Sequence, residues 1–237
     1  MMFFDFKKIF ITFFFLLPFS FVILAQCSVE NINPKKIPLR HKYKFIHNKY
    51  LENITNLDDL YPDCYSKRDS DLYYSQEDSF IVKENINTVW NKYKTISLKD
   101  IYSGNLVNLG FVYSKNKHKI YYVDDDYEGI CEGQVYFIRL NLLGGLKKLI
   151  VAYEVTKVDD EKKMIQFCYI NKGVSEGSQR VFLYKTKNGY TKIEHKTFYK
   201  SNSKLRDKRI YPIFHRKIVN ELHNNLIVSL DKKSKIK

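Results

Sequence analysis

Histidine and tyrosine are the residue types in this sequence whose positions could support chemistry or ligand binding. Among the six histidines, His195 alternates with Ile193, Thr197 and Tyr199, as residues on one face of a strand do. An imidazole titrates near neutral pH, so His195 could orient a ligand or act as a general base. A core histidine that is hydrogen-bonded to a neighbouring hydroxyl would show the same pattern, so both interpretations stay open.

Three more aromatic residues are candidates for the same predicted surface. Tyr153 and Tyr169 alternate with apolar residues in two other predicted strands, and Phe214 lies beside His215 in the last predicted helix. His215 could cover the mouth of a cavity or face solvent. Tyrosine suits an apolar pocket because its ring is hydrophobic and its hydroxyl is polar, although it is equally common in protein cores. The candidate ligand-binding set is His195, Tyr199, Tyr153, Tyr169 and Phe214, with no catalytic residue assigned.

Motifs for cofactors and metals are missing from the sequence. It contains no Walker loop, GxGxxG, HExxH or GxSxG motif, so we predict no cofactor and no metal. Asp124, Asp125, Asp126 and Glu128 could offer oxygens to calcium, but they lack the glycine and the distant glutamate of an EF-hand loop. A solvated acidic turn is the preferred interpretation of that segment.

The first 25 residues have the pattern of a signal peptide. Lys7 and Lys8 precede an apolar run over residues 9–24 that is interrupted by Pro18, and Ala25 offers a cleavage site. The run is shorter than the ~20 residues that a spanning helix needs, which favours cleavage over an uncleaved membrane anchor. We therefore expect an exported protein, either periplasmic, secreted or associated with a membrane.

The expected export affects how the four cysteines are interpreted. Cys27 follows Leu-Ala-Gln as in a bacterial lipobox, although glutamine is a poor residue just before the lipidated cysteine, so lipidation stays an alternative. Cys64, Cys131 and Cys168 would lie in an oxidising compartment, where disulfides persist. Cys131 and Cys168 fall in separate predicted strands and could pair, but sequence alone leaves the pairing open.

Hydrophobic periodicity divides the mature chain into an extended N-terminal arm (26–75), a main domain (76–230) and a basic tail (231–237). In the main domain, a strand at 79–83 and a helix at 85–93 precede a series of strands with short turns, of which Asn188-Gly189 predicts a type I′ hairpin. An apolar stripe predicts one long helix over 203–230, which Pro212 must kink or divide. The predicted strands lie at 109–115, 119–124, 131–141, 148–157, 163–171, 179–186 and 190–200.

This order predicts an α+β fold, in which a curved antiparallel sheet of six to seven strands wraps around the long C-terminal helix and leaves a cavity between them. The segment Phe80-Ile81-Val82, followed by Ile86, Val89 and Trp90, resembles the first strand and helix of the helix-grip superfamily. That superfamily is also called START-like, polyketide cyclase-like or SRPBCC. The stretch from Gly133 to Leu226 resembles a poorly characterised bacterial branch of it.

The formal charge of +14 is compatible with a protein that binds nucleic acid or an anionic membrane. Most cations are lysines spread along the chain, which is typical of a solvated surface. One group at the start of the last helix opposes the helix dipole and could contact an anionic membrane or envelope surface. An exported protein rarely meets nucleic acid, so we predict no nucleic-acid partner. The group comprises Lys204, Arg206, Lys208, Arg209, Arg216 and Lys217.

Three functions stay open at this level. The first is an exported, non-enzymatic module that binds a hydrophobic or amphipathic, lipid-like small molecule beneath the last helix. The second is a cyclase- or hydrolase-type enzyme with His195 as general base. The third is an envelope protein-interaction module with no open cavity, which a pocket smaller than about 300 Å³ would favour. The sequence predicts no oligomeric state.

Overall fold

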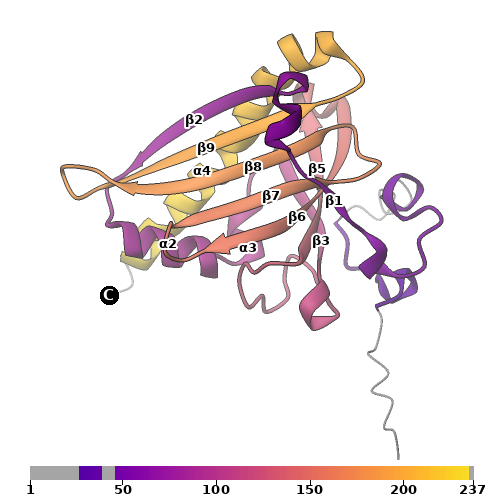
Figure 1. Cartoon of the computed structure of the whole chain (residues 1–237). Helices are drawn as coiled ribbons and strands as arrows, with labels where there is room; N and C mark the ends of the chain where they lie inside the picture. Colours follow the sequence, from indigo (N-terminus) through magenta and orange to yellow (C-terminus); the bar gives the residue numbers. More distant parts are fainter. Residues whose placement is uncertain (1–26, 39–45, 235–237) are drawn as a thin grey trace, which may run out of the picture.

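A single large antiparallel sheet lies at the centre of this computed structural model, which describes residues 27–38 and 46–234. A long helix, α4 (Tyr211–Ser234), runs along one face of the sheet (Figure 1). This arrangement confirms the predicted α+β class and the curved sheet with its C-terminal helix. The predicted signal peptide lies outside the described residues, and α4 continues into the predicted basic tail.

The described residues form nine strands, two more than the upper end of the predicted range. Along the sheet the order is β2-β9-β8-β7-β6-β5-β3-β4, and the short β1 pairs with β7. The excess arises because β1, from the N-terminal arm, and β2, which precedes the first helix, both join the main sheet. The strands are β1 (Pro62–Asp63), β2 (Tyr74–Val82), β3 (Val107–Ser114), β4 (Lys119–Tyr121), β5 (Gln134–Leu142), β6 (Lys147–Asp159), β7 (Met164–Ile170), β8 (Glu176–Lys185) and β9 (Thr191–Lys200).

Two irregularities in strand register contribute to the bending of the sheet. The pairing of β3 with β5 shifts between Leu109 and Phe111, and the pairing of β6 with β7 shifts between Val155 and Lys157. A β-bulge inserts an extra residue on one strand, which bends that strand and increases its twist. The bent sheet can therefore curve around a helix and still leave space beneath it.

The helix α2 (Ile86–Thr95) follows β2 as predicted. The side chain of Asn85 caps it by accepting a hydrogen bond from the Thr88 backbone N–H at 3.0 Å. Val89 and Trp90 are buried, and the Trp90 indole N–H donates to Asp160. A second helix, α3 (Leu98–Ile101), was not predicted, because four residues are too few to show a helical period.

The helix α4 starts after a π-helical turn at Arg206–Ile210, so Pro212 lies in the first turn of α4, where its missing N–H is tolerated. Glu221 fixes the middle of α4 to the sheet, because its carboxylate accepts the backbone N–H groups of Asn105, Leu106 and Val107 at 2.8–3.1 Å. Among the described residues, no helix has the length and apolar character needed to cross a bilayer.

The N-terminal arm covers the face of the sheet opposite α4 and builds a second hydrophobic core there. Its apolar residues, including Ile37, Tyr50 and Leu57, pack with outward-facing residues of β3, β5, β6 and β7. Phe111 and Phe137 stack in this core, with ring centroids 4.4 Å apart. Where the structure describes the arm, it consists of short helical turns and the strand β1, so the prediction of an extended arm is wrong there. Those turns are Val29–Asn31, His47–Leu51, Leu57–Asp59 and Lys67–Leu72.

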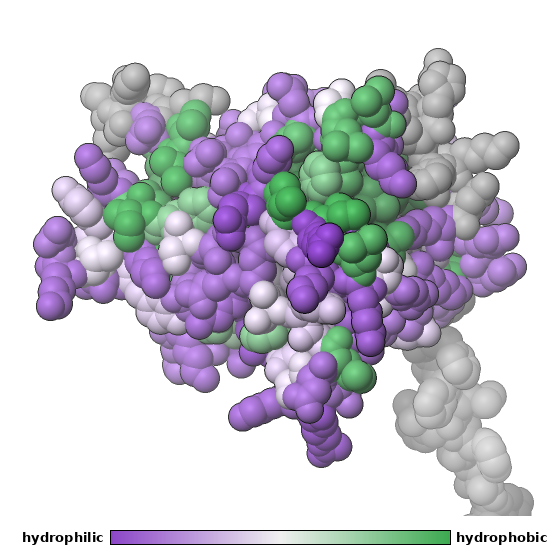
Figure 2. Space-filling model, turned by 90° about the horizontal axis from the view of Figure 1, so that it is seen from above, coloured by the Kyte–Doolittle hydropathy of each residue, from purple (hydrophilic) through white to green (hydrophobic). Residues whose placement is uncertain are grey.

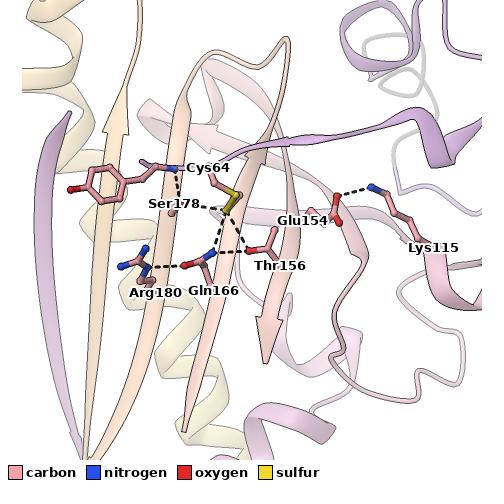
Figure 3. The surroundings of a disulfide bond; sticks show 9 residues. Cys64, Lys115, Glu154, Thr156, Gln166, Ser178 and Arg180 are labelled. Carbon is pink, nitrogen blue, oxygen red and sulfur yellow. Dashed lines mark hydrogen bonds and ion pairs between the residues drawn. A yellow bond between two sulfur atoms is a disulfide. The ribbon is translucent and has the colours of Figure 1, made fainter. Parts of the chain in front are cut away.

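A disulfide between Cys64 and Cys168 joins this arm to β7 (Figure 3). The sequence left the pairing open, and Cys168 pairs with Cys64 and not with Cys131. Cys131 lies in the loop before β5 instead of in a strand, and it carries a free thiol. The Tyr65 backbone N–H donates to Ser178 at 2.9 Å beside the disulfide, and Tyr65 stacks on Phe198 with ring centroids 4.2 Å apart.

The predicted hairpin between β8 and β9 is present, but its turn type differs from the prediction. The Gly189 N–H donates to the Thr186 carbonyl at 3.0 Å, and of Asn188 and Gly189 only Gly189 has a positive φ, of 79°. A type I′ turn needs positive φ at both central residues. The loop is instead a type I turn closed by a left-handed glycine, which is the usual three-residue hairpin connection.

Candidate functional site

A cavity of about 220 Å³ lies between the inner face of the sheet and the helices. Apolar residues of β5, β6 and β8 form its sides, while α3 and α4 contribute the opposite wall. Alternation along β9 is as predicted, because Ile193, His195, Thr197 and Tyr199 are all buried on the inner side. The cavity is slightly below the ~300 Å³ at which typical ligand pockets begin.

Four of the five predicted ligand-binding residues line this cavity. His195, Tyr153, Tyr169 and Phe214 come from four different elements, β9, β6, β7 and α4. Tyr199 is the exception. It is 1% exposed and donates its hydroxyl proton to the Asp207 carbonyl at 2.9 Å, and its ring stacks on Tyr211, with ring centroids 3.6 Å apart. It therefore supports a residue of the cavity wall instead of lining the cavity.

A chain of hydrogen bonds runs through His195 along the cavity wall. His195 Nε2 lies 2.9 Å from Gln179 Oε1, and His195 Nδ1 lies 3.0 Å from His223 Nε2. His223 Nδ1 lies 2.5 Å from the hydroxyl of Tyr93. At the other end, Gln179 Nε2 donates to the Tyr169 hydroxyl at 2.9 Å, and that hydroxyl lies 2.6 Å from the hydroxyl of Tyr211.

The direction of these bonds fixes the protons on both imidazoles. A carbonyl oxygen only accepts, so His195 Nε2 carries a proton and donates to Gln179. Burial lowers the pKa of His195 to about 4, against the opposing charge of Asp78, so the ring is neutral at pH 7 and its Nδ1 accepts from His223. His223 in turn accepts from Tyr93. Neither imidazole keeps a free lone pair, which removes the geometric basis for His195 as a general base.

His215 is the third histidine of the cavity and differs from the other two. Its Nε2 lies 3.4 Å from the hydroxyl of Thr197, but its buried Nδ1 has no hydrogen-bond partner. Burial and the neighbouring His195 hold the pKa of His215 well below its usual value. An unpaired buried nitrogen is costly in a folded protein and is characteristic of binding sites. Among the described residues, these histidines belong to no group arranged to hold a metal ion.

Sequence reasoning placed His215 only at the cavity mouth or in solvent and missed His223, Gln179 and Tyr211. For the two histidines, His215 and His223, the sequence did contain a signal. His215 and His223 follow Phe214 and Leu222, two members of the apolar stripe, by one position, and a helix buries a face at least 100° wide. No comparable signal existed for Gln179, because a polar residue in a strand is usually solvated.

A second group of polar atoms lies elsewhere in the cavity wall. The hydroxyls of Tyr102 and Tyr153 are 2.7 Å apart, and those of Tyr127 and Tyr136 both donate to Gln134 Oε1, at 2.8 and 3.0 Å. Burial raises the pKa of all four tyrosines. These hydroxyls are neutral at physiological pH. Tyr127 and Tyr136 use both of their protons on Gln134, whereas the Tyr102–Tyr153 pair shares one hydrogen bond and keeps one hydroxyl proton.

Comparison with solved structures extends the description of the fold. Norcoclaurine synthase from Thalictrum flavum, a point mutant in complex with a transition-state analogue, aligns with a TM-score of 0.50 at 13% identity. The alignment covers 68% of this chain and 96% of that one. The chain has the helix-grip fold. A major latex-like protein from Panax ginseng aligns with a TM-score of 0.46 at 13% identity, covering 67% of this chain and 97% of that one.

The helix-grip fold accounts for the position of the cavity between the sheet and α4. No protein-family model and no curated protein matches the sequence. At such low identity the likeness concerns the fold alone, so the chemistry of the site has to be argued from the residues of this chain.

Proposed function

We propose that this protein is an exported binding module, which holds a compact hydrophobic or amphipathic molecule in the cavity between the sheet and α4. The observation that carries the proposal is an apolar cavity whose lining includes His215, a buried histidine whose Nδ1 has no hydrogen-bond partner. Pockets of this composition bind by apolar burial and use a few placed polar groups for orientation.

The size of the cavity restricts the ligand. An engineered cavity of about 150 Å³ holds benzene. On that scale, about 220 Å³ accommodates a molecule of roughly ten non-hydrogen atoms. The lipid-like ligand expected from the sequence is thus replaced by a smaller molecule. A reaction that uses His195 as base has weaker support, because both nitrogens of His195 are engaged. The interaction module is the second candidate function: the cavity volume of about 220 Å³ lies below the ~300 Å³ that would count against it, whereas the apolar lining of the cavity supports the binding module.

A cavity-filling substitution tests the proposal. Val151, on β6, lines the cavity, and Val228, on α4, is 53% exposed. We expect native mass spectrometry of the purified wild type and of Val228→Phe to detect a co-purifying small molecule, and Val151→Phe to lack it. Retention of the same molecule by Val151→Phe, or the absence of any bound molecule in the wild type together with no thermal shift from small apolar compounds, would contradict the proposal.

Export of the chain is the second part of the proposal. The Cys64–Cys168 disulfide supports it, because disulfides persist in oxidising compartments. Cys27 is only 8% exposed, which supports a cleaved chain over one lipidated at Cys27. Mass spectrometry of the mature N-terminus would test this. A first residue of Gln26 is expected, whereas a lipidated Cys27 or an intact Met1 would contradict it.

We further propose that the end of the molecule around Arg206–Ile210 contacts an anionic membrane or envelope surface. Leu205, Ile210 and Ile213 are 46–62% exposed there, and Lys208 and Arg209 lie among them. Figure 2 shows hydrophobic groups beside hydrophilic ones on this upper side. Co-sedimentation with anionic vesicles, lost on Ile213→Asp and absent with zwitterionic vesicles, is the expected result. Equal recovery of wild type and variant would refute it.

A further inference from the structure

The polar groups of the cavity are biased towards binding a negatively charged partner. Among the described residues that line it, three are histidines, seven are tyrosines and one is an arginine, while none is an aspartate or glutamate. The side chains of the cavity wall therefore carry N–H and O–H donors and no carboxylate, although most of these donors already bond to one another. A ligand with an acceptor at its polar end matches this wall better than a ligand that carries an amine.

Two unsatisfied groups lie close together at one end of the cavity. The pair Tyr169 and Tyr211 has two hydroxyl protons but only one mutual hydrogen bond, and Tyr169 also accepts from Gln179. One hydroxyl proton of the pair is therefore left for another acceptor. The ring of Tyr211 stacks on that of His215, with ring centroids 5.0 Å apart, so the unpaired His215 Nδ1 belongs to the same region.

Arg206 adds positive charge to this end without being free to neutralise an anion by itself. It lines the cavity, and its positive charge opposes the rise in the pKa of Tyr169 and Tyr211 that burial causes. Its guanidinium is already paired with Asp207 at 3.2 Å and donates to Ser175 at 2.9 Å. Asp207 is 1% exposed and Arg206 is partly exposed, and the ion pair they form is close to neutral overall.

We propose that the ligand is a compact carboxylic acid, whose carboxylate is bound at Tyr211 and His215 beside Arg206 while its apolar part fills the rest of the cavity. This inference rests on the proposed function and names the class of ligand. The free hydroxyl proton of the Tyr169–Tyr211 pair donates to one carboxylate oxygen. His215 Nδ1, once protonated, donates to the other.

Binding of this ligand takes up one proton. His215 is neutral in the free protein, and its titratable ring neighbours are Tyr211 and His223 on α4 and His195 on β9. The charged groups on the adjoining elements form two ion pairs, Asp78–Arg216 and Arg206–Asp207. None of these supplies a net positive charge. A carboxylate that enters from neutral solution is thus neutralised only when His215 binds a proton from solvent.

The experiment compares octanoic acid with 1-octanol, which match the cavity in size and differ in the polar end. Isothermal titration calorimetry is performed at pH 6, 7 and 8. We expect octanoate to bind at least tenfold more tightly than octanol at pH 6, with an association constant that falls about tenfold per pH unit as one proton is lost. Octanol binding should not change with pH.

Two variants locate the effect. His215→Leu should lower octanoate binding at least tenfold and abolish its pH dependence, with octanol binding retained as evidence of folding. His118→Asn, which removes an imidazole from the β3–β4 turn outside the cavity, is the matched control and should behave as wild type. Tyr211→Phe should weaken octanoate severalfold, whereas Tyr184→Phe, on a side chain that is 44% exposed, should not.

The outcomes separate this inference from the proposed function. Octanol binding as tightly as octanoate, or octanoate binding with no pH dependence, would overturn the carboxylic acid and leave the binding module standing. Loss of neither affinity nor pH dependence in His215→Leu would overturn the assigned position of the carboxylate. Failure of both compounds to bind would overturn the cavity as a binding site and the inference with it.

Discussion

The covalent attachment of the N-terminal arm gives the sharpest test of this structure. The Cys64–Cys168 disulfide links residues that are 104 positions apart, and it lies where β1 pairs with β7. Replacing Cys64 with serine removes the bond and leaves a small polar residue in place. It leaves Cys168, which is buried, as a free thiol beside the hydroxyl of Ser178.

The magnitude follows from the length of the closed loop. A cross-link that closes a loop of about 100 residues restricts the unfolded chain by about 4.7 kcal/mol in the loop-entropy model. The buried contacts of the arm remain in the variant, so the loss is not enlarged by a cavity. We expect Cys64→Ser to lower the free energy of unfolding by roughly 3–5 kcal/mol.

Equilibrium urea unfolding of the mature chain measures this change. Cys131→Ser is the matched control, because Cys131 carries a free, partly exposed thiol and its loss should change stability by less than about 0.5 kcal/mol. Adding dithiothreitol should move the wild-type and Cys131→Ser curves to that of Cys64→Ser, and leave the Cys64→Ser curve unchanged. A Cys64→Ser midpoint equal to that of wild type, or a Cys131→Ser curve insensitive to reductant, would refute the assigned pairing.

Three further predictions concern α4 and the histidines. Glu221→Ala should lower the free energy of unfolding in urea by about 3 kcal/mol, because three backbone N–H groups lose their charged acceptor. The control Asn224→Ala, at an exposed position, should lower it by under about 0.5 kcal/mol, and equal losses would contradict the anchoring role of Glu221. His215→Leu should raise the unfolding free energy of the ligand-free protein by about 1 kcal/mol, because it removes an unpaired buried nitrogen; a clear drop would show that His215 has a partner. The free energy of unfolding should fall as the pH drops from about 6.5 to about 4, because His195 binds a proton in the unfolded chain but, with its pKa lowered to about 4, not in the folded one. The loss from His195 alone is about 3 kcal/mol. A free energy of unfolding that stays constant between pH 7 and 5 would contradict this prediction.

The main elements of the fold could be predicted because their signals are local. Alternation from Thr191 to Tyr199 requires only that neighbouring side chains point to opposite faces of a strand, and burial of one face follows. The spacing of Val89 and Trp90 similarly marked the buried side of α2. The position of the turn at Gly189 was predicted correctly and its type was not, because the residue types do not determine the φ angle of Asn188.

The candidate site was predicted only in part, and for a different reason. The sequence by itself determined which side of β9 is buried, and so placed His195 in the cavity wall. Only the tertiary structure decided that His195 meets His223, 28 residues away, and Gln179, 16 residues away, on separate elements. It likewise decided that Cys64 pairs with Cys168 and that His215 keeps a free nitrogen. Such partners are set by how the helix and strands pack together, and the periodicity of any single element carries no information about that packing.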